Sequence, residues 1–147
     1  MEQMRKWTAA WSLLLALAPV WWAQPVRGEE LDWKVTQETL TNGLTVVVLE
    51  DHHAPVVILQ VWYKVGSRNE QLGRTGISHL LEHLMFRGTP KHGQGEFSRL
   101  VQEKGGMHNA FTGNDQTVYF ETTAAPHLDL LLELEADRMA NLTLDET

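Results

Sequence analysis

Residues 76 to 89 read GISHLLEHLMFRGT. In an α-helix, side chains three and four positions apart lie on the same face, so His79, Glu82 and His83 would project together. Neutral imidazole is a good zinc ligand, and a carboxylate beside a zinc-bound water can accept its proton as the water attacks a carbonyl. The spacing therefore predicts His79 and His83 as ligands of Zn²⁺ and Glu82 as a catalytic general base.

The residues around this triad predict a short amphipathic helix. Its apolar residues at helical spacing, which we expect to face the core, are Ile77, Leu80, Leu81 and Leu84. Thr75 is in position to cap the start, and Gly88 followed by Pro90 predicts the end. The alternative is an ordinary amphipathic helix with two incidental histidines near a glutamate.

Further motifs follow one another along the chain. They are Leu40-Thr41-Asn42-Gly43-Leu44, Gly66-Ser67-Arg68, Gly105-Gly106, Asn109-Ala110-Phe111-Thr112, Thr117-Val118-Tyr119 and Glu135-Ala136-Asp137-Arg138-Met139. With residues 76 to 89, they resemble the start of an M16 zinc peptidase, of the insulinase, pitrilysin and mitochondrial-processing-peptidase type. The H-x-x-E-H order of the triad is that of the inverzincins. The resemblance covers roughly Val35 to Met139.

The resemblance implies a third zinc ligand, because a catalytic zinc site needs three protein ligands and the triad supplies two. In the family this ligand is a glutamate on a helix that follows the one ending here near Met139. That helix would lie beyond Thr147, so we expect the 147-residue form to be an inactive N-terminal fragment. Within the chain, Glu133 and Glu135 are better explained as the solvated face of the last helix. His108 is better explained as a cleft-lining side chain that does not touch the metal.

The resemblance also implies how a substrate would bind. M16-like peptidases bind an extended peptide along an exposed sheet edge beside the metal. Ala110 would then pair with the peptide backbone, while Asn109 would help position the scissile amide. The alternative is an ordinary strand with Asn109 at a turn or bulge. Members of the family often work in pairs or enclose substrates with a second half, so a partner subunit is also expected.

The first 28 residues predict a secretory signal peptide. Arg5 and Lys6 precede a mostly apolar stretch from Trp7 to Ala18, and small or turn-forming residues follow. Cleavage after Gly28, which fits slightly better than cleavage after Ala23, would leave residues 29–147 as the N-terminal part of an M16-like peptidase domain. We expect a periplasmic or secreted protein, without stable membrane insertion after the leader is removed; the alternative is an uncleaved anchor.

The composition argues against nucleic acid as a partner and against any role for cysteine. The net charge of −7 makes nucleic acid a poor partner. Cysteine is absent, which excludes disulfides and thiolate zinc ligands.

Hydrophobic periodicity predicts an α+β fold, with an antiparallel or mixed sheet and helices packed on one side. A hairpin joins two strands through Asn42-Gly43, and Val56–Val65 is apolar enough for a central strand covered on both faces. The expected strands are Val35–Thr41, Leu44–Glu50, Val56–Val65, Met107–Thr112 and Gln116–Thr123. The expected helices are the triad helix, Glu96–Lys104 and a final helix that opens at Pro126.

Two functions of other classes fit the same residues. One is a non-catalytic M16-like subunit, against which the intact triad argues. The other is a peptide-binding module whose sheet edge serves association alone.

Overall fold

The computed structural model describes residues 33–144, so the expected leader at residues 1–28 lies outside the described part. The chain divides after Glu50 into two compact units. In the first unit, strands β1 (Val35–Thr39) and β2 (Thr45–Leu49) pair antiparallel. Their turn is closed by a hydrogen bond from Leu40 N to Leu44 O at 2.8 Å, which confirms the hairpin expected around Asn42.

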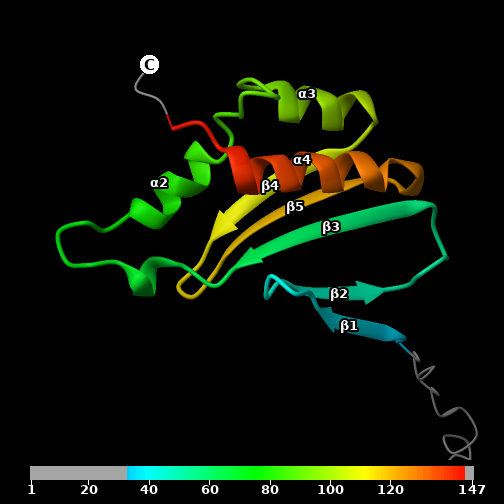
Figure 1. Cartoon of the computed structure of the whole chain (residues 1–147), viewed down its shortest axis with the longest axis horizontal. Coiled ribbons are helices and arrows are strands. Elements are labelled where there is room, and N and C mark those ends of the chain that lie inside the picture. The colour runs from blue at the N-terminus through cyan, green and yellow to red at the C-terminus, as the bar shows by residue number, and fades with distance from the viewer. Residues whose placement is uncertain (1–32, 145–147) are drawn as a thin grey trace, which may run out of the picture. The chain divides into compact units, whose positions relative to one another are not determined.

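The second unit holds every predicted site residue. Its elements in chain order are β3 (Val56–Tyr63), η1 (Ser67–Asn69), α2 (Ile77–Leu84), α3 (Glu96–Glu103), β4 (Met107–Thr112), β5 (Thr117–Ala124), η2 (Ala125–His127) and α4 (Leu128–Asn141). The sheet has the order β3-β5-β4 and is antiparallel throughout. Helices α3 and α4 lie over the same face of it, which confirms the α+β class (Figure 1).

Strand β5 is the central strand, and it is buried along most of its length. Strand β3 lies at an edge, and its residues alternate between exposed and half-buried. The prediction that Val56–Val65 is a central strand with both faces covered is therefore wrong. An apolar run shows that a segment can be buried but does not show which neighbours it has. The true central strand was less conspicuous because it carries threonines and a glutamate among its buried residues.

The apolar core lies between the two helices and the sheet. Phe97 and Val101 of α3 meet Leu131 and Leu134 of α4, with half-buried residues of β3 packed against them. Gly105 ends α3 with a φ of +69°, as expected for a helix-terminating glycine.

A charged cluster is buried beside this core. The Arg138 guanidinium pairs with Glu135 on the same helix and with Glu121 on β5, at 3.4 Å for the latter. All three side chains are almost fully buried, so the prediction that Glu135 lies on a solvated face is wrong. Periodicity could not separate a solvated glutamate from one held by an internal arginine. Burial and the neighbouring Glu135 raise the pKa of Glu121 to about 9.

Three aromatic rings complete the surroundings of Arg138. Its guanidinium carbon lies 4.4 Å from the ring centroid of Tyr119, 4.5 Å from that of Phe97 and 5.1 Å from that of Phe86. Such cation–π contacts strengthen when the cation is removed from water. The cluster therefore ties β5, α3 and α4 to the segment that follows α2. Among residues 33–144, no helix is both long and apolar enough to cross a bilayer.

Candidate metal centre

Helix α2 carries the predicted triad, but it is turned the opposite way from the expectation. Ser78 and Glu82 are buried, whereas the apolar side chains of Ile77 and Leu80 are 52% and 55% exposed. Leu81 is also exposed, so the prediction that these residues face the core is wrong. Periodicity identifies two faces of a helix without showing which one meets the sheet. Here the polar face meets β4, where hydrogen-bonding partners are available.

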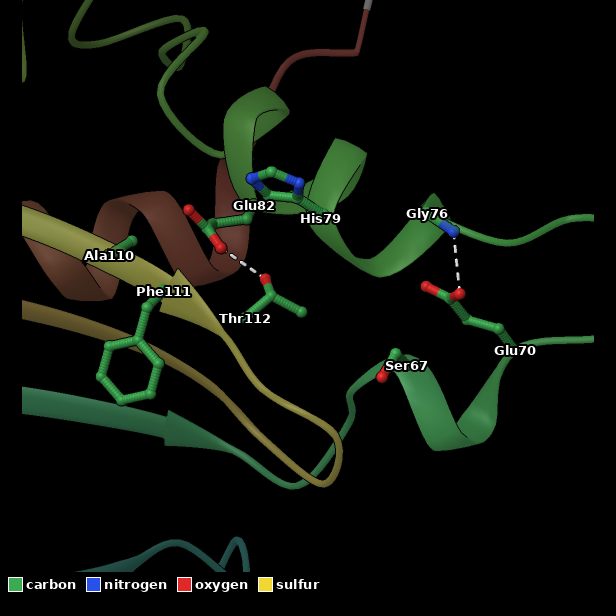
Figure 2. Close-up of a pocket in the computed structure, with 8 residues that line it drawn as sticks. All are labelled: Ser67, Glu70, Gly76, His79, Glu82, Ala110, Phe111 and Thr112. Atoms are coloured by element: carbon green, nitrogen blue, oxygen red, sulfur yellow. Dashed lines mark hydrogen bonds between the residues drawn. The ribbon is translucent and has the colours of Figure 1, made fainter.

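The start of α2 also differs from the prediction. The N-cap is Gly76, with a φ of 90°, a backbone conformation that favours glycine, and no side chain of its own caps the helix. Thr75 is therefore not the cap. Instead, Glu70 accepts hydrogen bonds from Gly76 N at 2.8 Å and from Ser78 N at 2.9 Å, the first of which is drawn in Figure 2. These amide donors, Ser78 first, hold the pKa of Glu70 below its usual range.

The two histidines are brought together on successive turns of α2. Their Nε2 atoms lie 3.1 Å apart, and their ring centroids are 4.7 Å apart. Two nitrogens bound tetrahedrally to one zinc at about 2.0–2.1 Å would lie roughly 3.3 Å apart. The positions of His79 and His83 therefore fit a pair of ligands to a single zinc ion.

Glu82 lies one helical turn from His79, with its carboxylate turned toward β4. The Thr112 hydroxyl donates a hydrogen bond to Glu82 Oε2 (Figure 2). Thr112 belongs to the last position of β4 and is itself within 3.5 Å of the Thr117 hydroxyl. Thr117 donates to Val65 O at 3.0 Å. The buried carboxylate is thus held by a hydroxyl whose own strand is anchored to its neighbours.

A pocket of about 360 Å³ opens beside these groups. Its lining residues are Ser67, Glu70, Gly76, His79, Glu82, Ala110, Phe111 and Thr112 (Figure 2). Glu82 and His79 on α2 therefore share a pocket with Ala110, a predicted substrate-binding residue on β4, whereas His83 is not among the lining residues. Sequence reasoning missed Ser67, Glu70 and Thr112 as members of the site. Thr112 belongs to the motif Asn109-Ala110-Phe111-Thr112, which was recognised in the sequence, whereas none of the sequence motifs contains Glu70.

Ala110 and Asn109 occupy the free edge of β4. Asn109 is exposed, and its side-chain oxygen accepts a hydrogen bond from Ala110 N at 2.9 Å. The Ala110 N–H is thus engaged by the side chain of its neighbour, on a strand that pairs with β5 on one side only. Asn109 lies in a regular strand whose register with β5 is unbroken, and not at a turn or bulge.

The in-chain alternatives for a third ligand are engaged elsewhere. His108 packs against the rings of Phe86 and Phe97, with centroids 5.4 and 5.5 Å away, instead of lining the pocket as expected. Burial, followed by the charge of Arg138, lowers its pKa. Glu133 is exposed and pairs with Lys91, as predicted for a solvated helix face. Over residues 33–144, no three His, Cys, Asp or Glu side chains converge on one point that could hold a metal ion.

Comparison with known proteins agrees with this geometry. The sequence pattern of the family described as Insulinase (Peptidase family M16) matches residues 45–147. The chain belongs to this family. The "Zinc protease PqqE" of Helicobacter pylori is 47% identical to the chain over 109 residues, which is 74% of this chain and 24% of that protein. The "Mitochondrial-processing peptidase subunit beta" of Lentinula edodes is 34% identical over 107 residues, or 73% of this chain and 23% of that one.

The M16 fold is found in solved structures as well. A crystal structure of a protease from Helicobacter pylori superposes with a TM-score of 0.75 at 45% identity, over 78% of this chain and 28% of that one. The chain spans about a quarter of the length of the curated M16 relatives it matches. The part of this chain that the family pattern matches includes α2.

Proposed function

We propose that this M16 chain provides two zinc ligands, the general base and the substrate-binding strand of a metallopeptidase that hydrolyses peptides. One observation carries the proposal. His79 and Glu82 on α2 line the same pocket as Ala110 on the free edge of β4. The names of the two relatives, a zinc protease and a processing peptidase, support the same class of activity.

His79 and His83 would hold the metal. Bound zinc would lower the pKa of a water molecule and polarise the scissile carbonyl. Glu82 accepts a proton from the attacking water as its oxygen bonds to the carbonyl carbon. The same carboxyl group then gives the proton to the leaving nitrogen as the C–N bond breaks, so that an acid and an amine are released.

The peptide would lie along β4. In this arrangement the N–H of Ala110 donates to a peptide carbonyl, in place of the Asn109 side chain that it meets now. The released Asn109 amide could then contact the scissile peptide group. Backbone pairing of this kind fixes the direction of the peptide and leaves its side chains to set specificity.

The third zinc ligand is proposed to lie outside the part of the chain described here, beyond Thr147. Two imidazoles alone should bind zinc weakly, so the 147-residue form is proposed to be nearly inactive. A further part of the same fold, or an M16-like partner subunit, would complete the site. The chain is also proposed to act in the periplasm or outside the cell, after loss of residues 1–28.

The test compares the 147-residue chain with a chain extended beyond Thr147 in its reading frame. Zinc content and peptide cleavage are measured in both. We expect near-stoichiometric zinc and cleavage in the extended form and neither in the short one. Equal cleavage by both forms would show that a residue of this chain completes the site. Stoichiometric zinc without cleavage in the extended form would indicate a non-catalytic subunit.

A further inference from the structure

Helix α2 carries the whole predicted triad, but its N-cap residue, Gly76, has no side chain that could bond the first amides of the helix. The first amide groups of a helix have no partner inside the helix and must find one elsewhere. At the start of α2, the Glu70 carboxylate takes two of them, with one oxygen on Gly76 N and the other on Ser78 N. A negative charge in this position also opposes the positive end of the helix dipole.

The backbone that carries Glu70 is fixed to the turn between β4 and β5. Ser67 N donates to Gly113 O at 3.1 Å, and Arg68 N donates to Asn114 O at 2.9 Å. The Ser67 hydroxyl also donates to the Asn114 side chain at 3.0 Å. Glu70 N closes the turn of η1 with a bond of 3.2 Å to Ser67 O. Glu70 is therefore presented by a segment that cannot slide along the hairpin.

The same hairpin holds α2 at a second point. Thr112, the last residue of β4, bonds to Glu82 in the middle of the helix. With Glu70 at the N-terminus, the helix has two attachments to one strand pair. His79 lies between these attachments, and it shares the pocket wall with Glu70 and Glu82 (Figure 2).

We propose that Glu70 is a positioning residue of the metal centre, which fixes the N-terminal turn of α2 so that His79 meets His83 at the separation zinc requires. The inference rests on the proposed zinc-binding function. Glu70 touches neither metal nor substrate in this role, and it acts through the two amides. Removal of groups that orient metal ligands typically lowers metal affinity by about 10–100-fold.

The test uses Glu70→Gln, which keeps the size of the side chain but loses the charge and places an NH₂ group where one acceptor was. Glu70→Ala is a second variant in case the amide finds a substitute geometry. Glu103→Gln is the matched control, because Glu103 is an exposed glutamate on α3 that pairs with Arg99 and lies outside the pocket beside α2. All variants are made in the chain extended beyond Thr147 and are titrated with zinc while the ring signals of His79 and His83 are followed by NMR. The hydrogen exchange of the Gly76 and Ser78 amides is measured in the same variants.

We expect Glu70→Gln to lose zinc affinity by about tenfold or more and to exchange both amides faster, with far-ultraviolet circular dichroism unchanged. The control should match the wild type in all three measurements. A variant with wild-type zinc affinity would overturn the positioning role, even if its two amides exchanged faster. An extended wild-type chain that bound no zinc would instead refute the proposed function, and the positioning role with it.

Discussion

The Thr112 hydroxyl at the end of β4 donates a hydrogen bond to the Glu82 carboxylate on α2. This contact joins the proposed general base to the strand that would carry the substrate. Because Glu82 is buried and Thr112 is half-buried, the bond fixes the direction of the carboxylate. Catalysis by Glu82 should therefore depend on a residue that touches neither zinc nor the scissile bond.

Replacement of Thr112 by valine tests this dependence, since valine keeps the shape and removes the donor. In a form that hydrolyses peptides, we expect kcat to fall about tenfold to a hundredfold, because a hydrogen bond to a charged group contributes about 1.5–3 kcal/mol. KM and bound zinc should be little changed. Thr112→Ser restores the hydroxyl and should recover most of the rate. Equal rates for the serine and valine variants would contradict the assignment.

Substitutions of Glu82 and of the two histidines should differ in their effects on bound zinc and on the rate of peptide cleavage. In the extended, zinc-competent form, Glu82→Gln cannot accept a proton, so we expect cleavage to fall by about a hundredfold to ten-thousandfold with zinc retained. His79→Ala and His83→Ala should lose zinc and cleavage together. Zinc analysis alongside kinetics decides the case. Loss of zinc from Glu82→Gln would make the carboxylate a ligand instead of the base.

Glu121 should make the second unit less stable as the pH rises. Its pKa is raised to about 9 in the folded protein, above the 4.5 of the free side chain. The folded state then holds more protons than the unfolded state between these values, so the stabilisation present below about pH 4.5 is lost as the pH rises toward 9. Glu121→Gln cannot titrate, so its stability relative to the wild type should increase with pH. Urea midpoints at pH 5 and pH 9 give the comparison, and parallel pH profiles would exclude the effect.

Gly66 should tolerate no side chain. A Cβ there would lie 2.7 Å from Asn114 O and closer still to Gly113 O, both backbone atoms. We expect Gly66→Ala to destabilise the fold by about 1–3 kcal/mol, as overpacking does. Gly93→Ala is the control, because a Cβ at Gly93 meets nothing within 4 Å. Denaturant unfolding of the two variants should differ clearly, and similar midpoints would mean that the turn yields easily.

The leader prediction concerns the route of the protein. The basic, apolar and small-residue order of residues 1–28 predicts that the exported species begins near Glu29. N-terminal sequencing of protein recovered outside the cytoplasm measures this directly. An intact Met1 in a membrane fraction would identify an anchor in place of a cleaved leader.

The sequence was most informative where a local pattern decides the structure. The strand expected at Met107–Thr112 matches β4 to the residue, and the helix expected at Glu96–Lys104 matches α3, which ends one residue earlier. The triad could be placed on a helix for the same reason. Each of these features depends on residues within or next to one segment.

The errors arose where the answer depends on a distant segment. The apolar face of α2 was expected to face the core, but it is exposed. The residues of α2 alone do not show that Thr112, on β4, donates a hydrogen bond to Glu82 on the opposite face of the helix. Glu70 caps a helix six residues away and has no cap-like position in the sequence. Glu135 was expected to be solvated, but it is buried against Arg138, which also pairs with Glu121 on β5. Helical spacing within α4 cannot predict a contact with a residue on another strand.

The Arg138 cluster has a consequence for how the second unit assembles. If α4 detached while the sheet kept its form, Glu121 would lose its cation, and the three rings would lose theirs. Leu131 and Leu134 of α4 would leave the apolar core at the same time, so a half-assembled unit of this kind should scarcely be populated. Helix α4 and the sheet should therefore fold and unfold together. Unfolding should follow a single cooperative step without a stable intermediate that lacks α4.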